Sequence, residues 1–116
     1  MGPEKQYEER VTKWLRSVGV YPIRYPAKKM QTPPCGYYIK RWGGGPYARK
    51  GLPDLQIVVN QRCLEVELKA EHGKPSADQT ETVNWMLSVG GQACIIYPDD
   101  FEALKRVVRR MKGDKS

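Results

Sequence analysis

The spacing of hydrophobic positions changes several times along the chain, and each spacing predicts a different element. Between residues 4 and 18 apolar side chains recur every three or four positions, which predicts an amphipathic helix that ends at Gly19. Residues 20–35 contain four prolines and several basic residues, and we interpret them as a long ordered loop, an insertion between regular elements. Residues 37–42 favour a strand that ends in the glycine-rich stretch 43–51.

The second half of the chain predicts a hairpin, two helices and a further strand. Polar and apolar residues alternate in two strand-like segments, 54–59 and 62–69. Ser76 and Gln79 form a capping-box pattern at the start of a helix. A short buried strand at 92–98 and a last amphipathic helix at 99–112 follow, before a tail at 113–116 that we expect to be flexible. The predicted order is α-β-β-β-α-β-α, an α/β fold with a mixed sheet flanked by helices.

Asn60 and Gln61 can form a two-residue hairpin loop, and this loop determines how the two segments pair. Leu55 then lies opposite Val66, on an apolar face that also includes Ile57 and Leu64. A slip of one residue would mix the apolar and charged sets, so the pattern itself favours this register. The other face pairs Gln56 with Glu65 and Asp54 with Glu67, and it includes Lys69.

Two carboxylates on neighbouring strands repel each other, so a positive group is expected between Asp54 and Glu67. Lys69 is one candidate and a divalent cation is the other. Oxygen ligands favour Mg²⁺ or Mn²⁺ over zinc. The alternative is a solvated sheet face on which glutamates and lysine form salt bridges. That alternative explains Glu67 and Lys69 but gives no reason for Asp54. Glu65 does not fit the spacing between Glu67 and Lys69, so for Glu65 we favour either support of the site's ligands or a salt bridge.

Composition narrows the classes of partner. The chain has 116 residues, the size of one domain, and 20 basic against 13 acidic residues give a net charge of +7. This excess favours nucleic acid over a membrane as the partner, although an inert basic surface is the alternative. No apolar run is long enough to span a membrane, and the polar N-terminus does not resemble a secretory signal. Three cysteines without paired spacing and one histidine predict reduced thiols in a cytoplasmic protein rather than a zinc site.

The charged residues of the hairpin resemble a known nuclease signature. The dipeptide PD at Pro53–Asp54, followed by ELK at Glu67–Lys69, is similar to the PD-(D/E)XK motif. Further stretches resemble the small stand-alone VRR-NUC proteins of phages and prophages: EKQYEERVTKWL, WGGGPYARKGLPDL, ELKAEHGKPSADQ and GGQACIIYPDDFEAL. The resemblance covers nearly all of residues 4–108, apart from the insertion at 20–35. It implies a restriction-endonuclease-like core and a single nuclease domain over residues 1–116.

The resemblance also implies roles for individual residues. Asp54 and Glu67 would bind Mg²⁺, for which Mn²⁺ can substitute, together with the main-chain carbonyl of Leu68. Lys69 would orient or activate the attacking water. Glu4 matches a glutamate of the first helix that is usually a further ligand, with Glu8 as the alternative, and Gln79 matches a glutamine close to the site. The matching positions are, in full, Glu4, Asp54, Glu67, Leu68, Lys69 and Gln79.

Contacts with DNA are expected from basic residues near these positions. The glycine-rich stretch lacks the GK[ST] ending of a P-loop, so no nucleotide cofactor is expected. Its Arg49 and Lys50, and Lys74 in the GKPS turn, are candidates for phosphate contacts. Basic residues of the last helix and of the insertion are further candidates, although such residues usually form only a solvated surface.

The resulting hypothesis is a Mg²⁺-dependent endonuclease that cuts DNA. The resemblance implies a homodimer that acts on branched DNA, particularly four-way (Holliday) junctions, in the cytoplasm of a bacterium that hosts a phage or prophage. The nearest alternative is a flap, nicking or general phage nuclease that uses the same residues. A non-catalytic basic DNA-binding module and a protein–protein adaptor are two hypotheses from different functional classes.

Overall fold

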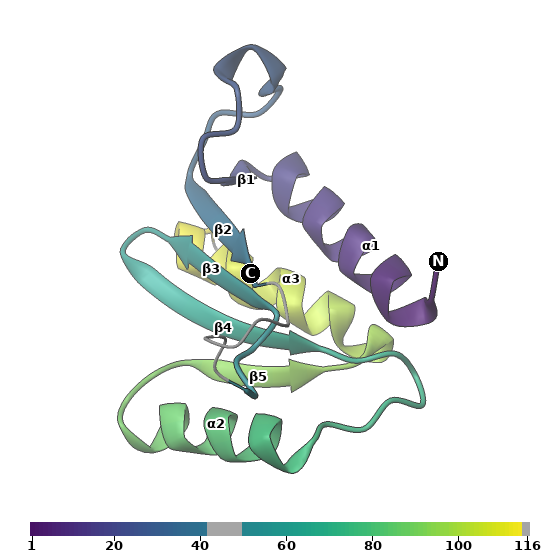
Figure 1. The fold of residues 1–116 in the computed structure, drawn as a ribbon. Coiled ribbons are helices and arrows are strands. Elements are labelled where there is room, and N and C mark those ends of the chain that lie inside the picture. The colour runs from purple at the N-terminus through teal and green to yellow at the C-terminus, as the bar shows by residue number, and fades with distance from the viewer. Residues whose placement is uncertain (42–49, 115–116) are drawn as a thin grey trace.

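The protein forms a five-stranded mixed sheet with helices on both faces (Figure 1). The structure, a computed structural model, describes residues 1–41 and 50–114. The strands are β1 (Val20–Pro22), β2 (Gly36–Lys40), β3 (Leu55–Val59), β4 (Arg62–Leu68) and β5 (Ala93–Ile96). The helices are α1 (Pro3–Ser17), α2 (Ala77–Ser88) and α3 (Phe101–Lys112), and short 3₁₀ turns occupy Ala27–Lys29 and Pro98–Asp100.

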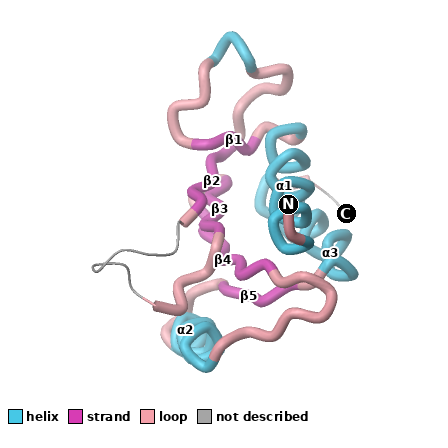
Figure 2. Tube along the Cα trace, turned by 45° about the vertical axis from the view of Figure 1, so that its right-hand side comes forward, coloured by secondary structure: helices cyan, strands magenta, loops and turns pink. Residues whose placement is uncertain are grey.

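The strands lie in the sheet in the order in which they occur in the chain. β1 pairs parallel with β2, β4 pairs parallel with β5, and the pairs in between are antiparallel. Helices α1 and α3 cover one face, and α2 lies on the other side, next to β5 (Figure 2). The hydrophobic core lies between the sheet and the α1/α3 layer, and it includes Leu15, Ile57, Val66 and Val108, each fully buried. The predicted α/β fold is confirmed.

The β3–β4 hairpin has the predicted register. Leu55 pairs with Val66, Ile57 with Leu64, and Gln56 with Glu65. Asn60 and Gln61 have φ angles of 51° and 66°, the left-handed conformation that a tight two-residue loop of type I′ requires. Because side chains alternate along a strand, this register sends Leu64, Val66 and Leu68 into the core and Glu65 and Glu67 to the opposite face.

The segment interpreted as a loop over residues 20–35 includes one strand more than predicted. Val20 and Tyr21 are buried in β1, which lies at the edge of the sheet and ends at Pro22, where a missing amide hydrogen is tolerated. A three-residue strand is too short to show an alternating pattern, so only its pairing with β2 reveals it. β2 covers Gly36–Lys40, and residues 42–49 lie outside the described part of the chain, as do residues 115–116 of the predicted tail.

Candidate metal centre

Three carboxylates from separate parts of the chain converge at one end of the β3–β4 hairpin. Asp54 directly precedes β3, Glu67 is near the end of β4, and Glu4 is in the first turn of α1. One oxygen from each of them lies within 4.8 Å of the others. Antiparallel pairing explains the first two positions, since the beginning of β3 lies beside the end of β4. The packing of α1 against the sheet brings Glu4 to them.

Main-chain amides hold both the side chain and the carbonyl of Asp54. Its Oδ2 accepts a hydrogen bond of 3.0 Å from the amide of Leu68, and its carbonyl accepts one of 2.8 Å from the amide of Arg41. The side chain therefore points toward the end of β4, on the face where pairing with Glu67 was predicted. These bonds hold the carboxylate in place while leaving its other oxygen available to a ligand.

Glu67 is only 1% exposed, and its two oxygens have different surroundings. Oε2 accepts a hydrogen bond of 3.1 Å from Nε2 of Gln79 and lies 3.2 Å from Nζ of Lys69. Oε1 is buried and has no hydrogen-bond partner among the residues that the structure describes. Burial, and then the negative charge of Asp54, raise the pKa of Glu67 to about 7, although Lys69 opposes that shift.

The unpaired oxygen of Glu67 fits a divalent cation. A buried carboxylate oxygen without a partner costs free energy, and a cation between Glu4, Asp54 and Glu67 would supply the missing interaction. The donors are all oxygens, which suits hard cations such as Mg²⁺ or Mn²⁺. The arrangement can therefore hold a divalent cation, as expected from the sequence.

Gln79 serves two contacts at once. Its side-chain Oε1 accepts a hydrogen bond from the amide of Ser76, and its own amide donates to Oγ of Ser76, so the capping box is confirmed. Its Nε2 still reaches Glu67. The sequence left the capping role and a position close to the site as alternatives, and the folded chain satisfies both, because the cap and Glu67 use opposite ends of the amide.

Of the two glutamates considered for the first helix, Glu4 belongs to the carboxylate cluster. Glu8, one turn later, pairs with Lys40 at 2.7 Å between Oε1 and Nζ. The contribution of the Leu68 carbonyl stays a prediction. Lys50 and Lys74 are exposed, whereas Arg49 lies outside the described residues, so their contacts with DNA also stay predictions.

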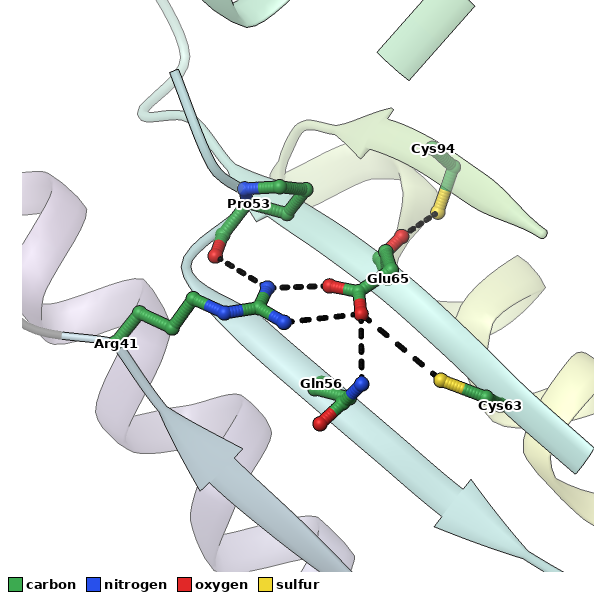
Figure 3. Close-up of polar contacts among 6 residues, drawn as sticks. All are labelled: Arg41, Pro53, Gln56, Cys63, Glu65 and Cys94. Atoms are coloured by element: carbon green, nitrogen blue, oxygen red, sulfur yellow. Dashed lines mark hydrogen bonds and ion pairs between the residues drawn. The ribbon is translucent and has the colours of Figure 1, made fainter. Parts of the chain in front are cut away.

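Figure 3 shows a second charged cluster, around Glu65, which the sequence did not predict in full. Glu65 forms the expected salt bridge, and its partner is Arg41, whose Nη2 lies 3.0 Å from Oε1. Gln56 donates to the same oxygen at 2.9 Å, and Nη1 of Arg41 donates to the carbonyl of Pro53 at 3.1 Å. The hydrogen bond to Glu65 raises the pKa of Arg41 above its usual value.

Arg41 thus contacts the residues on both sides of the Pro53–Asp54 peptide. Nothing in the local sequence around Arg41 pointed to this contact. The available signal was Glu65 itself, a charged residue in a strand otherwise rich in apolar side chains, which needed a cation from elsewhere.

The fold and the site together define a carboxylate centre on a mixed sheet, with a lysine two residues after the buried glutamate. No known protein-family profile matches the sequence, and no curated protein sequence matches it. Among solved structures, the chain is similar to one described as a VRR_NUC domain protein, with a TM-score of 0.66 and 18% sequence identity. The match covers 97% of this chain and 92% of the other. It confirms the expected fold over almost the whole length. No helix in the described residues is long and apolar enough to cross a membrane.

Proposed function

We propose that the protein is a metal-dependent endonuclease that hydrolyses phosphodiester bonds in DNA. The observation that supports this most is the cluster of Glu4, Asp54 and Glu67, with Nζ of Lys69 beside the Glu67 carboxylate. The fold shared with a VRR_NUC domain protein is consistent with the proposal. A net charge of +7 suits a polyanionic substrate.

Each residue of the centre has a distinct task in this reaction. Glu4, Asp54 and Glu67 would hold the cation, which supplies Lewis-acid polarisation of the scissile phosphoryl group and offsets its charge. Gln79 fixes the orientation of the Glu67 carboxylate through Oε2. Asp54 is kept in position by the amide of Leu68.

Lys69 would act on the attacking water. Its ammonium is held by Glu67 and is almost completely buried, so its position is well defined. From there it orients the water toward phosphorus and stabilises the negative charge that develops as the bond to the leaving oxygen breaks.

For the substrate, we propose branched DNA, and in particular four-way junctions, cut by a homodimer. A two-fold dimer presents two equivalent centres to a junction that is itself roughly two-fold. Helix α2 has exposed apolar side chains near its end and just after it, Trp85, Leu87 and Val89, with exposed fractions of 66%, 50% and 60%. Such a surface suits a second copy of the chain. A cytoplasmic location in a phage or prophage host, and the three free thiols, are compatible with this function.

The test compares a labelled four-way junction with a matched linear duplex, in Mg²⁺ and in EDTA. We expect wild type to make symmetrical, Mg²⁺-dependent cuts in the junction, and we expect Asp54→Ala and Lys69→Ala to bind it without cutting. The matched control is Arg62→Ala, which removes an exposed charge at the start of β4 and should cut normally. Circular dichroism checks that each variant is folded.

Three further outcomes have clear meanings. Equal cutting of both substrates would replace junction specificity with a general, flap or nicking nuclease. Mg²⁺-independent binding without any cutting by wild type would favour a non-catalytic DNA-binding module. A one-chain mass from light scattering at micromolar concentration would refute the dimer.

A further inference from the structure

A basic groove extends along α1 to the loop between β1 and β2. Its first part, of about 610 Å³, lies between α1 and the end of β2, and Arg10, Lys13, Arg16 and Lys40 line it. Its second part, of about 380 Å³, lies between the last turns of α1 and the loop, and Lys13, Arg16, Tyr25 and Lys29 line it. Lys13 and Arg16 line both parts, so the two parts adjoin along α1.

The charge of the groove is strongly one-sided. Arg10, Lys13, Arg16, Lys29 and Lys40 contribute positive charge, and Glu9 is the one acidic residue among the described residues that line it. Lys40 is engaged by Glu8, and Arg16 donates a hydrogen bond of 2.9 Å to the hydroxyl of Tyr38. Lys13 and Lys29 are exposed. Positive charge concentrated in a concave surface is the arrangement that attracts a phosphate backbone.

The loop that forms the far wall is well braced. The Tyr21 hydroxyl donates to the carbonyl of Thr32 at 2.7 Å and accepts from its amide at 3.2 Å, and the Thr32 hydroxyl donates to the carbonyl of Ser17 at 3.1 Å. Tyr21 and Tyr25 stack with ring centroids 5.0 Å apart and planes only 9° apart. These contacts hold the insertion against the end of α1, so the loop that carries Tyr25 and Lys29 has a defined position.

The groove begins near the end of α1 that carries Glu4, where Met1 and Gln6 line it, and leads away from that end. Glu4 lies in the first turn of α1, whereas Ser17 at its last turn borders the second part of the groove. The β1–β2 loop stands beyond that end of the helix (Figure 1). A helix of 15 residues spans about 22 Å, which corresponds to roughly six base pairs of duplex.

We propose that this groove binds the sugar-phosphate backbone of a DNA arm that leaves the metal centre, with the β1–β2 loop gripping the arm roughly six base pairs from the scissile bond. The insertion is then a DNA-positioning element. The proposal rests on the proposed function for the direction of the arm, but the groove's affinity for DNA is measured without cleavage.

The test measures binding of fluorescent duplexes and junctions by anisotropy, with Ca²⁺ in place of Mg²⁺ to prevent cutting. Lys13→Gln with Lys29→Gln should weaken binding roughly tenfold. It should also reduce the slope of log affinity against log salt by about two. The matched comparison, Arg106→Gln with Arg110→Gln, removes the same charge from exposed positions of α3, whose basic residues are the competing candidates for phosphate contacts, and it should change affinity far less.

Arm length provides the second measurement. On junctions whose arms are shorter than about six base pairs, the difference between wild type and the groove variant should disappear. Wild-type affinity in the groove variant, or an equal loss in the α3 variant, would overturn the proposal. Loss of affinity in the groove variant of a protein that never cuts DNA would leave the groove standing and refute the nuclease. Normal cutting by wild type, with unchanged DNA affinity in the groove variant, would leave the nuclease standing and refute the groove.

Discussion

Replacing Glu67 by glutamine removes a buried negative charge while preserving the shape of the side chain. In the folded protein, burial and the charge of Asp54 raise the pKa of Glu67 from 4.5 to about 7. A group that binds protons more tightly when folded stabilises the fold at low pH. That contribution is fully present below pH 4.5 and is lost as the pH rises through 7.

The magnitude follows from the shift. A pKa raised from 4.5 to about 7 corresponds to about 3 kcal/mol of unfolding free energy that wild type loses between low and high pH. Glutamine cannot ionise and does not lose it. In EDTA, Glu67→Gln should therefore match wild type near pH 4 and exceed its stability at pH 8 by about 2 to 3 kcal/mol. In Mg²⁺ at pH 8, this difference in stability should narrow or reverse, because wild type gains binding free energy from the cation that the variant lacks.

Urea denaturation followed by tryptophan fluorescence measures stability in all three conditions. Carboxylates far from Glu67 contribute equally to both proteins, so they cancel in the difference. Glu81→Gln is the control, because it removes a negative charge from an exposed position on α2 rather than from a buried one. It should show no such pH-dependent gain in stability. If Glu67→Gln is instead less stable than wild type at pH 8 in EDTA, then burial does not set the protonation of Glu67, and the argument for a metal at its unpaired oxygen fails.

Two further predictions concern the hairpin and its neighbour. Arg41→Gln should cost about 2 to 3 kcal/mol of unfolding free energy, because the buried Glu65 carboxylate loses its cation. It should also raise the Mg²⁺ concentration needed for cutting, because the guanidinium no longer holds the Pro53 carbonyl next to Asp54. Adding Glu65→Gln should restore part of that stability in a double-mutant cycle; simple additivity would contradict the coupling. Gln61→Gly should raise stability by about 0.5 to 1 kcal/mol, since Gln61 has a φ of 66° that glycine adopts without strain. A lower thermal midpoint in that variant would refute the type I′ assignment.

Local patterns in the sequence were sufficient for the elements nearest the centre. Alternation along residues 54–69 determined the hairpin register, because a shift of one residue would have exposed the apolar set and buried the charges. The same alternation placed Glu65 and Glu67 on one face. Ser76 and Gln79 predicted the start of α2, since a capping box depends only on residues three apart.

Contacts between distant residues were beyond such patterns. β1 is too short to have a period, and it exists because β2 offers a free edge to pair with. Arg41 follows β2, yet its guanidinium lies against Glu65, 24 residues later. No spacing rule relates the two, since the approach depends on how the strands pair and where the chain turns.

The sequence by itself determined that Asp54, Glu67 and Lys69 would share one face of a hairpin, because alternation and pairing are local consequences of strand geometry. Only the tertiary structure decided that Glu4, rather than Glu8, joins them. One turn separates the two glutamates, and their surroundings depend on how far α1 slides along the sheet as its buried side chains pack into the core. That position is set by the whole core, and the sequence of the helix alone does not contain it.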